Sequence, residues 1–372
     1  MYLEVAVFEN FRNIEHFPFS FSEGMNILYG GNAQGKTNVI EGIYLFAGGK
    51  SFRRARDRDL IKLDRDFGQV SISYGDVRRD NKMSLRYFRE AKKEFFFNGV
   101  KLKKMSEFIG NFKAVLFCPE HLAIVKDEPA VRRGFIDTAI SQIKPAYLGT
   151  LIEYEKILEQ KNALLKNFGD YSKDSFDKTY EVLSERLAED AAYISEVRKE
   201  YLSRLFCHVG EFLSDMTDGK EEISYEYVSS LCSGDGISGD TESDKKKYFE
   251  IIMAGKEREI GAKTSIFGAH RDDFDIRLGG RSAKIFASQG QQRSIALALK
   301  LGEGELCREE TGDYPVFLFD DVFSELDRSR KNYILKRLSG KQVIVTSCDE
   351  SDFEGCEGAR KIYVENGNYF YR

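Results

Sequence analysis

Eight residues near the start of the chain have the types and spacing of a loop that binds phosphate. They are Gly30, Gly31, Asn32, Ala33, Gln34, Gly35, Lys36 and Thr37, and they fit the pattern G-x-x-x-x-G-K-[ST] at every fixed position. Glycines allow a tight turn whose backbone N–H groups converge on phosphate oxygens. Lys36 would carry positive charge to the β- and γ-phosphates of ATP, and the Thr37 hydroxyl would bind Mg²⁺.

A second motif supplies the carboxylates that such a loop needs. The apolar run Val316–Phe319 is typical of a buried strand, and Asp320 and Asp321 follow it directly. We expect Asp320 on the Mg²⁺ side of the nucleotide and Asp321 where a general base would orient water. Lys36, Asp320 and Asp321 are therefore the candidate catalytic residues, and Thr37 and Asp320 are the candidate metal ligands. For this motif alone, an acidic turn that closes a strand is the alternative.

A third motif lies between the first two. In Ser288-Gln289-Gly290-Gln291-Gln292-Arg293, the small residues permit close backbone approach, and a predicted helix follows. Because a helix N-terminus favours an anion, Ser288, Gly290 and Gln291 form a candidate second contact with phosphate. The alternative is an ordinary helix N-cap, but the position of the motif ahead of Asp320 favours the phosphate contact.

The predicted elements around these motifs are strands and helices in alternation. Apolar alternation or short apolar runs predict strands, a 3.6-residue period predicts helices, and Asn98-Gly99 is a hairpin signal. The predicted strands are Tyr2–Phe8, Met25–Tyr29, Gln69–Tyr74, Met83–Phe88, Glu94–Phe97, Asp273–Leu278, Val316–Phe319 and Gln342–Thr346. The predicted helices beside the motifs are Lys36–Phe46 and Gln291–Cys307.

The middle of the chain has a different pattern. Residues from Pro129 to Phe212 show helical periodicity with breaks at Pro145 and at Asn167–Asp170, whereas Ser233–Asp244 has the composition of a loop. We therefore predict an α/β fold in which residues 1–112 and 268–372 form one lobe and residues 113–267 form an inserted, mainly helical lobe.

Composition argues against several classes of protein. No apolar run approaches the roughly 20 residues of a membrane-spanning helix, and the N-terminal residues lack the pattern of a secretory signal. The six cysteines include no C-x-x-C pair, which predicts free thiols rather than a disulfide framework or a zinc site. We expect a cytoplasmic protein with no membrane partner.

The order of the three motifs resembles that of ABC-type ATPases, and Ser324-Glu325-Leu326-Asp327 resembles their D-loop. In that class the signature motif, here Ser288–Gln291, contacts the γ-phosphate of ATP held by a second subunit. The resemblance therefore implies an ABC-type P-loop ATPase lobe, ATP and Mg²⁺ as cofactors, and an ATP-dependent homodimer.

Within this class, the chain resembles the RecF family of bacterial recombination-repair proteins from about residue 2 to residue 347. The segments that carry the resemblance are Asn10–Asn13, Lys50–Arg53, Phe117–Glu120, Arg132–Asp137, Tyr154–Asn162, Gly268–Asp273 and Ala287–Arg293. Cys118, Gly134 and Ala269 stand where the family pattern leads us to expect Ser, Arg and Pro, which bears on local packing. The resemblance implies ATP-dependent binding of single-stranded, gapped or junction DNA. It also implies recombinase loading with RecO- and RecR-like partners, maintenance of replication forks and support of the SOS response.

The resemblance further implies weak, DNA-dependent ATP hydrolysis that acts as a switch. Two features fit slow hydrolysis. Asp321 is one methylene shorter than the glutamate common in fast ABC ATPases, so it would place a water less well. Thr346-Ser347 stand where transporters often carry a histidine that contacts the γ-phosphate.

The distribution of charge suggests where DNA would bind, although the net charge is −5. Between Lys50 and Lys104 there are 17 Lys and Arg against 8 Asp and Glu. Lys50, Arg53, Arg54, Arg56 and Arg58 are the candidate contacts with DNA phosphates, and Arg12 is a candidate contact with the nucleotide. The alternative is a solvated surface, since acidic residues interleave with these arginines.

Other classes of protein share parts of the pattern. An SMC-type DNA-tethering ATPase would show long heptads and a zinc hook. A transporter subunit would lack the Asn10-Phe11-Arg12 segment and the large helical insertion, and a P-loop kinase for small molecules needs neither signature nor D-loop. His270 is expected to be structural, with its neighbours Arg271, Asp272 and Asp273 forming ion pairs that join the lobes.

Overall fold

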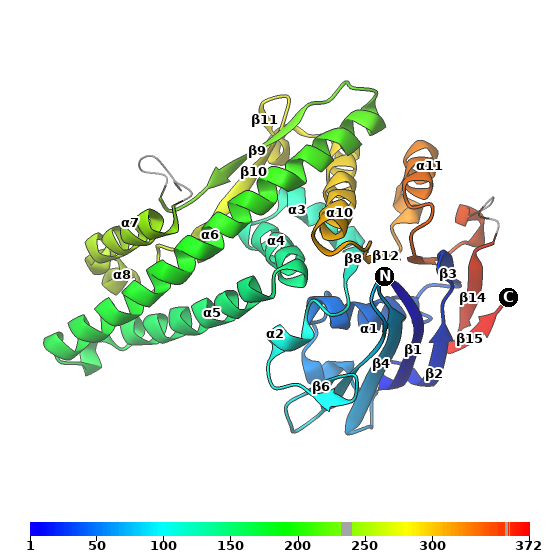
Figure 1. The fold of residues 1–372 in the computed structure, drawn as a ribbon, viewed down its shortest axis with the longest axis horizontal. Coiled ribbons are helices and arrows are strands. Elements are labelled where there is room, and N and C mark those ends of the chain that lie inside the picture. Colours follow the sequence, from blue (N-terminus) through cyan, green and yellow to red (C-terminus); the bar gives the residue numbers. More distant parts are fainter. Residues whose placement is uncertain (232–239, 354–355, 357) are drawn as a thin grey trace. The chain divides into compact units, whose positions relative to one another are not determined.

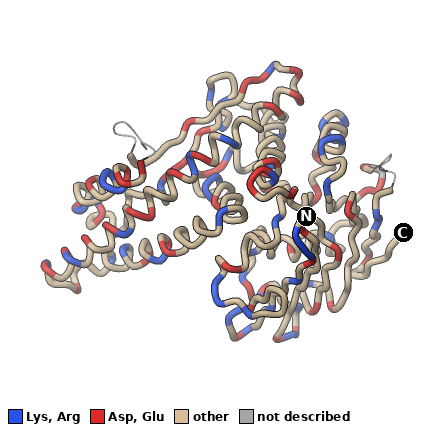
Figure 2. The backbone as a smooth tube through the Cα atoms, in the orientation of Figure 1, with Lys and Arg blue, Asp and Glu red and all other residues tan. Residues whose placement is uncertain are grey.

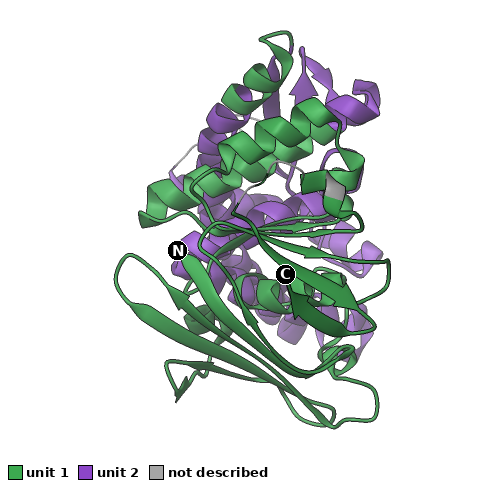
Figure 3. Ribbon diagram, turned by 90° about the vertical axis from the view of Figure 1, so that its right-hand side faces the viewer, with its two compact units in different colours: residues 1–122, 211–220, 293–372 green, residues 123–210, 221–292 purple. Residues whose placement is uncertain are grey.

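The computed structural model describes residues 1–231, 240–353, 356 and 358–372. The chain divides into two compact units (Figure 3). Unit 1 comprises Met1–Leu122, Glu211–Lys220 and Arg293–Arg372, and unit 2 comprises Ala123–Gly210 and Glu221–Gln292. Unit 1 is thus built from both ends of the chain, as the sequence predicts. The bounds differ from those of the predicted lobes, because residues 113–122 and 211–220 belong to unit 1 and residues 268–292 to unit 2.

In the described part of unit 1, the strands form two six-stranded sheets (Figure 1). The first is antiparallel, in the order β2-β1-β4-β5-β6-β7. Its strands are β1 (Tyr2–Phe11), β2 (Ile14–Ser20), β4 (Phe67–Gly75), β5 (Asp80–Phe88), β6 (Glu94–Phe97) and β7 (Val100–Lys101).

The second sheet has the order β15-β14-β3-β13-β12-β8, and all of its strands except β15 run parallel. Its strands are β3 (Met25–Tyr29), β8 (Ala114–Phe117), β12 (Val316–Asp320), β13 (Val343–Ser347), β14 (Arg360–Glu365) and β15 (Asn368–Tyr371). The residues of β8, β12 and β13 are buried throughout, which explains why these segments are continuous apolar runs rather than alternating ones.

Helix α1 (Lys36–Gly48) contacts strands of both sheets, among them β1, β4, β12 and β13. Val39, Ile40, Tyr44 and Leu45 are all buried, and their positions are spread around the whole circumference of the helix. A helix that is apolar on all sides belongs in a core, so α1 is held firmly from its first turn onward. The other α-helices described in unit 1 are α2 (Met105–Phe108), α11 (Arg328–Arg337), most of α10 (Gln289–Thr311) and the end of α6 (Lys173–Thr217).

Unit 2 is mainly helical, as predicted. Its described helices are α3 (Ala123–Lys126), α4 (Pro129–Ile143), α5 (Pro145–Lys166), most of α6 (Lys173–Thr217), α7 (Thr241–Ala254), α8 (Lys256–Ala262) and α9 (Ala283–Phe286). The breaks predicted at Pro145 and Asn167–Asp170 separate α4, α5 and α6. Its described strands β9 (Ile223–Val228), β10 (Asp273–Leu278) and β11 (Arg281–Ser282) form one antiparallel sheet.

Buried ion pairs hold the helices of unit 2 to the segment Gly268–Asp273. Arg198 on α6 makes a bidentate pair with Asp137 on α4 (2.8 Å) and donates to the carbonyl of Ala269 (2.7 Å). Arg132 pairs with Asp273 (2.7 Å). All of these residues belong to unit 2, so the pairs lie within that unit and do not join it to unit 1, contrary to the expectation for this segment. They explain why the segment clusters with unit 2.

The prediction of a loop at Ser233–Asp244 is wrong for its last residues. Residues 233–239 lie outside the described residues, but α7 begins at Thr241. Glu242 and Asp244 fall in the first turn, where negative charge is favourable, and Asp244 is fully buried. The acidic residues therefore mark a helix start rather than the continuation of a loop.

Candidate nucleotide site

The loop from Gly30 to Gly35 joins β3 to α1 and has the backbone shape of a phosphate cradle. Gly30, Ala33 and Gly35 have φ of 147°, 61° and 108°. A Cβ on Gly30 would lie 2.2 Å from the carbonyl oxygen of Val364, and one on Gly35 would lie 2.5 Å from the Asn13 amide. Both positions therefore require glycine, for space as well as for conformation.

Lys36 places its charge at the centre of this loop. Its side chain is buried, and Nζ donates to the carbonyl oxygens of Gly30 (2.6 Å) and Gly31 (2.7 Å). An ammonium held among loop backbone atoms at the start of a helix fits the phosphates of a nucleotide. The prediction for Lys36 and the glycines is consistent with this geometry.

Thr37 and Asp320 come together at the carboxyl edge of the parallel sheet. Thr37 Oγ1 donates to Asp320 Oδ1 (2.9 Å), and Thr346 Oγ1 at the end of β13 donates to the same oxygen (2.8 Å). Burial raises the pKa of Asp320, the two hydrogen bonds lower it, and the carboxylate of Asp321 raises it. A hydroxyl beside a partly desolvated carboxylate is an oxygen donor set that suits Mg²⁺.

Asp321 lies at the same edge in an unusual backbone conformation, with φ of 51°. Its N–H donates to Thr346 Oγ1 (3.0 Å), and its carbonyl accepts from Ser324 Oγ (3.0 Å). Thr346 thus connects both aspartates, a role that its sequence position did not reveal.

Glu120 is a residue of this edge that motif analysis missed. It follows β8, the parallel neighbour of β12, and its carboxylate contributes to the raised pKa of Asp320. The available signal was its position: an acidic residue shortly after a buried apolar strand, as with Asp320.

The signature residues lie in unit 2, at the start of α10. Ser288 is exposed, its N–H donates to Gln291 Oε1 (2.8 Å), and Gln291 N–H donates to Ser288 Oγ (3.3 Å). Gln291 Nε2 also donates to Glu221 (2.8 Å). This reciprocal pattern is a capping box, so the N-cap is formed, and the phosphate contact of Ser288, Gly290 and Gln291 stays a prediction.

Arg12 is turned toward α1. Its guanidinium makes a bidentate pair with the buried carboxylate of Glu41 (2.7 and 2.8 Å) and donates to the carbonyl of Asp59 (3.0 Å). Glu41 also accepts from Ser51 Oγ (2.5 Å). These contacts show a structural role for Arg12, and its predicted contact with nucleotide remains untested.

The candidate DNA-binding cations are exposed on the segment after α1: Lys50, Arg53, Arg54, Arg56 and Arg58. Arg53 donates to Asn38 Oδ1 (3.1 Å), and Arg58 lies 3.7 Å from the Asp59 carboxylate. Asp57 and Asp59 interleave with these arginines, and basic and acidic residues also interleave along α5 and α6 (Figure 2).

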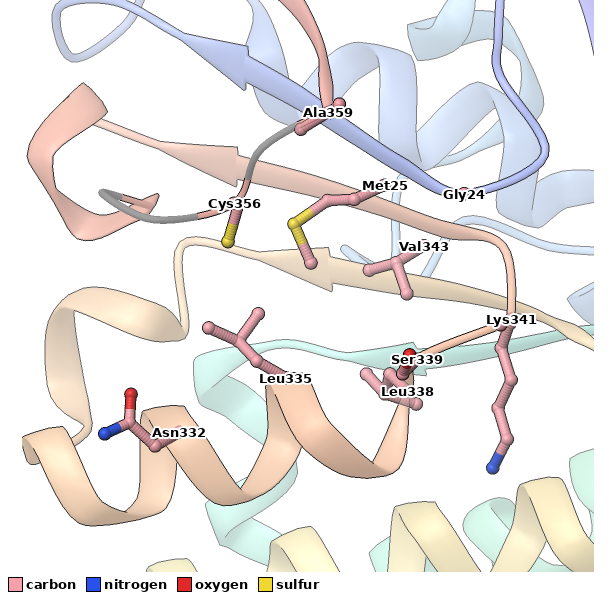
Figure 4. A pocket seen from close by; sticks show the side chains of 12 residues that line it. Gly24, Met25, Asn332, Leu335, Leu338, Ser339, Lys341, Val343, Cys356 and Ala359 are labelled. Carbon is pink, nitrogen blue, oxygen red and sulfur yellow. The ribbon is translucent and has the colours of Figure 1, made fainter.

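A cavity of about 560 Å³ lies at the opposite edge of the parallel sheet, where β3 and β13 begin (Figure 4). Met25, Leu335, Leu338 and Val343 contribute apolar side chains to its wall, and Lys341 beside them pairs with Glu305 (3.0 Å). Ligands of parallel sheets bind at the carboxyl ends of strands, so the loop edge, and not this cavity, is the candidate nucleotide site.

No helix in the described part of the chain combines the length and the apolar character that crossing a membrane requires. The described cysteines Cys118, Cys207, Cys307, Cys348 and Cys356 carry free thiols, as predicted.

Comparison with known proteins identifies the family. A family model for the RecF/RecN/SMC N terminal domain matches residues 2–369. The DNA replication and repair protein RecF of Clostridium acetobutylicum is 37% identical over 354 residues, which are 95% of this chain and 94% of that protein. The RecF protein of Ruminiclostridium cellulolyticum is 38% identical over 374 residues, covering 100% and 97% of the two chains.

Solved structures agree with the sequence relatives. The recombination mediator protein RecF-ATP in the RecFOR pathway matches with a TM-score of 0.92 and 35% identity, covering 100% of this chain and 97% of that one. An SMC head bound to the C-winged helix domain of ScpA, with a TM-score of 0.57 and 15% identity, shares the fold. The predicted ABC-type ATPase fold is confirmed, and this chain belongs to the RecF family of DNA replication and repair proteins.

Proposed function

We propose that this protein is an ATP-dependent DNA-binding protein of recombinational repair and replication-fork maintenance. The observation that carries the proposal is the meeting of Lys36, Thr37 and Asp320 at one sheet edge, in a chain that is similar over its whole length to RecF-ATP. Membership of the RecF family favours this function over that of a small-molecule kinase.

The nucleotide site holds ATP with Mg²⁺. The glycine loop and Lys36 bind the phosphates, and the oxygens of Thr37 and Asp320 hold the metal. A bound Mg²⁺ supplies positive charge that neutralises phosphate oxygens. Asp321 orients a water, and its short side chain makes hydrolysis slow, so that hydrolysis resets the protein rather than drives it.

ATP binding brings two copies of the chain together through the signature. Ser288 and Gln289 are exposed. Ile285 and Phe286, which come just before the motif, have 72% and 64% of their surface exposed. Exposed apolar side chains beside a polar motif are typical of surfaces that another protein covers. A second copy of this chain is the partner that we propose for this surface, because the signature motif of ABC-type ATPases contacts ATP in a neighbouring subunit.

The ATP-bound dimer binds single-stranded, gapped or junction DNA through the cations from Lys50 to Arg58. With RecO- and RecR-like proteins it then helps to load recombinase and supports the SOS response. The name of the similar solved structure, which places that protein in the RecFOR pathway, supports these partners.

The test is to size the protein by light scattering with and without ATP–Mg²⁺, and then with a gapped duplex. We expect monomers without ATP, dimers with ATP, and DNA binding by the dimer only. A Lys36→Ala variant should stay monomeric in all conditions. ATP binding by a monomer that neither pairs nor binds DNA would contradict the proposal and favour a kinase.

A further inference from the structure

Cys348 lies among three residues of the nucleotide site. It follows β13, the strand between β3 and β12, so its side chain stands beside the ends of both motif-bearing strands. Its thiol donates to Asn32 Oδ1 of the phosphate loop and to Asp321 Oδ1 (3.7 Å), and Lys36 Nζ donates to its sulfur (3.9 Å).

The chemistry of this thiol suits a positioning role. Cys348 is exposed, yet burial of its sulfur and the neighbouring Asp321 carboxylate raise the pKa of the thiol, while the Lys36 ammonium lowers it. With its pKa raised, the side chain keeps its single S–H proton, which Asn32 Oδ1 and Asp321 Oδ1 can share as acceptors. Buried Cys118 and Cys307, by contrast, have no such contacts with the phosphate loop among those described.

We propose that Cys348 is a positioning residue of the nucleotide site, whose thiol holds Asn32 of the phosphate loop and the Asp321 carboxylate beside the terminal phosphate. The inference rests on the proposed ATP site and adds a residue that none of the sequence motifs includes. Bound ATP should therefore shield the thiol from reagents, and removal of the thiol should slow hydrolysis without weakening the binding of ATP.

The first test uses the wild-type protein. Iodoacetamide is added with and without ATP–Mg²⁺, and alkylation of each cysteine is followed by mass spectrometry of its peptide. At an ATP concentration about ten times the Kd, only about a tenth of the sites are free of ATP, so Cys348 should react about tenfold more slowly. Cys207, exposed on α6 in unit 2, is the matched control and should react at one rate in both samples.

A separate binding measurement distinguishes the two proposals. If labelled ATP binds but Cys348 reacts at an unchanged rate, the inference about Cys348 is overturned and the ATP site stands. If no ATP binds to the wild-type protein, the proposed function itself fails, and the inference fails with it.

The second test separates positioning from simple proximity. Cys348→Ala removes the donor, and we expect single-turnover hydrolysis to fall about tenfold with KM unchanged, because a misplaced Asp321 orients water poorly. Cys348→Ser keeps a donor and should recover most of the rate. Equal hydrolysis by the alanine variant and the wild type would overturn the positioning role, even where ATP protects the thiol.

Discussion

Thr37 and Asp320 are 283 positions apart in the sequence, and a hydrogen bond of 2.9 Å from Thr37 Oγ1 to Asp320 Oδ1 joins them. The bond connects the first turn of α1 to the end of β12, so it links the phosphate loop to the acidic motif. Thr346 donates to the same carboxylate oxygen from β13, the strand between β3 and β12. The starts or ends of three elements, α1, β12 and β13, therefore meet at the carboxylate that we propose as a metal ligand.

Replacing that carboxylate should separate ATP binding from hydrolysis. In Asp320→Asn the amide oxygen still accepts from Thr37, so we expect the fold to persist. Hydrolysis should fall by about 100-fold or more, because a neutral amide holds Mg²⁺ poorly. Mg²⁺ should also no longer raise the affinity for ATP, which a nucleotide titration with and without the metal would measure. Asp64→Asn, an exposed acid of the same unit, is the control, and hydrolysis at the wild-type rate by Asp320→Asn would remove Asp320 from the site.

Lys161 and Glu259 form an ion pair in the interior of unit 2, with both side chains fully buried and Nζ 2.7 Å from Oε2. Lys161→Met should lower the free energy of unfolding by about 3–5 kcal/mol, because it leaves the Glu259 carboxylate buried without its counter-charge. Urea denaturation followed by circular dichroism would measure the change.

The exposed pair Lys178–Asp174 provides the control for the buried one. Its side chains are 74% and 77% exposed, so Lys178→Met should change the same free energy by only about 0–1 kcal/mol. Equal effects of the two lysine variants would mean that burial does not govern the strength of the Lys161 pair.

His270 should make unit 2 less stable in acid. Its Nδ1 lies 2.6 Å from Tyr154 OH and its Nε2 lies 3.2 Å from the carbonyl oxygen of Ser265, an arrangement that a neutral ring satisfies. The pKa of His270 is lowered to about 4, mainly by burial and also by the charge of Arg271, while the hydrogen bond to Ser265 opposes this shift. The unfolded chain, with a pKa near 6.5, therefore binds this proton more readily than the folded one.

The stability that His270 contributes is complete above about pH 6.5 and is lost as the pH falls toward 4. After a discount for solvent screening, His270 contributes roughly 2 kcal/mol of pH-dependent free energy of unfolding. His270→Gln should remove this part of the slope when the free energy of unfolding is measured at pH 7 and pH 5. An identical slope in the variant would show that other groups cause the acid sensitivity.

The exposed cations after α1 should govern the salt dependence of DNA binding. Replacing Arg53, Arg54 and Arg56 with alanine should weaken binding to duplexes of any sequence. It should also reduce the slope of log K against log salt by about 0.9 for each DNA phosphate that the variant no longer neutralises. The matched control replaces three exposed lysines on helices of unit 2, Lys156, Lys178 and Lys246. A slope that does not change in the arginine variant would exclude this segment from the DNA surface.

Elements whose signals are local could be predicted from the sequence. The glycine loop before Lys36, the apolar runs of β3, β12 and β13, and the Asn98-Gly99 hairpin each depend on residues within a few positions of one another. Glycine geometry and side-chain periodicity act over that range, so these elements and the ATP motifs were accessible without a structure. The family followed from the order of such motifs.

The tertiary fold determines which distant residues meet. The parallel pairing of β3, β13 and β12 brings Thr37, Thr346 and Cys348 to Asp320 and Asp321, and no local pattern encodes that pairing. The same holds for Arg12, which pairs with Glu41 on α1 and not with the phosphate loop. Contacts between residues that are hundreds of positions apart depend on how whole strands and helices pack. Many side chains contribute to that packing energy, so no single segment of the sequence determines it.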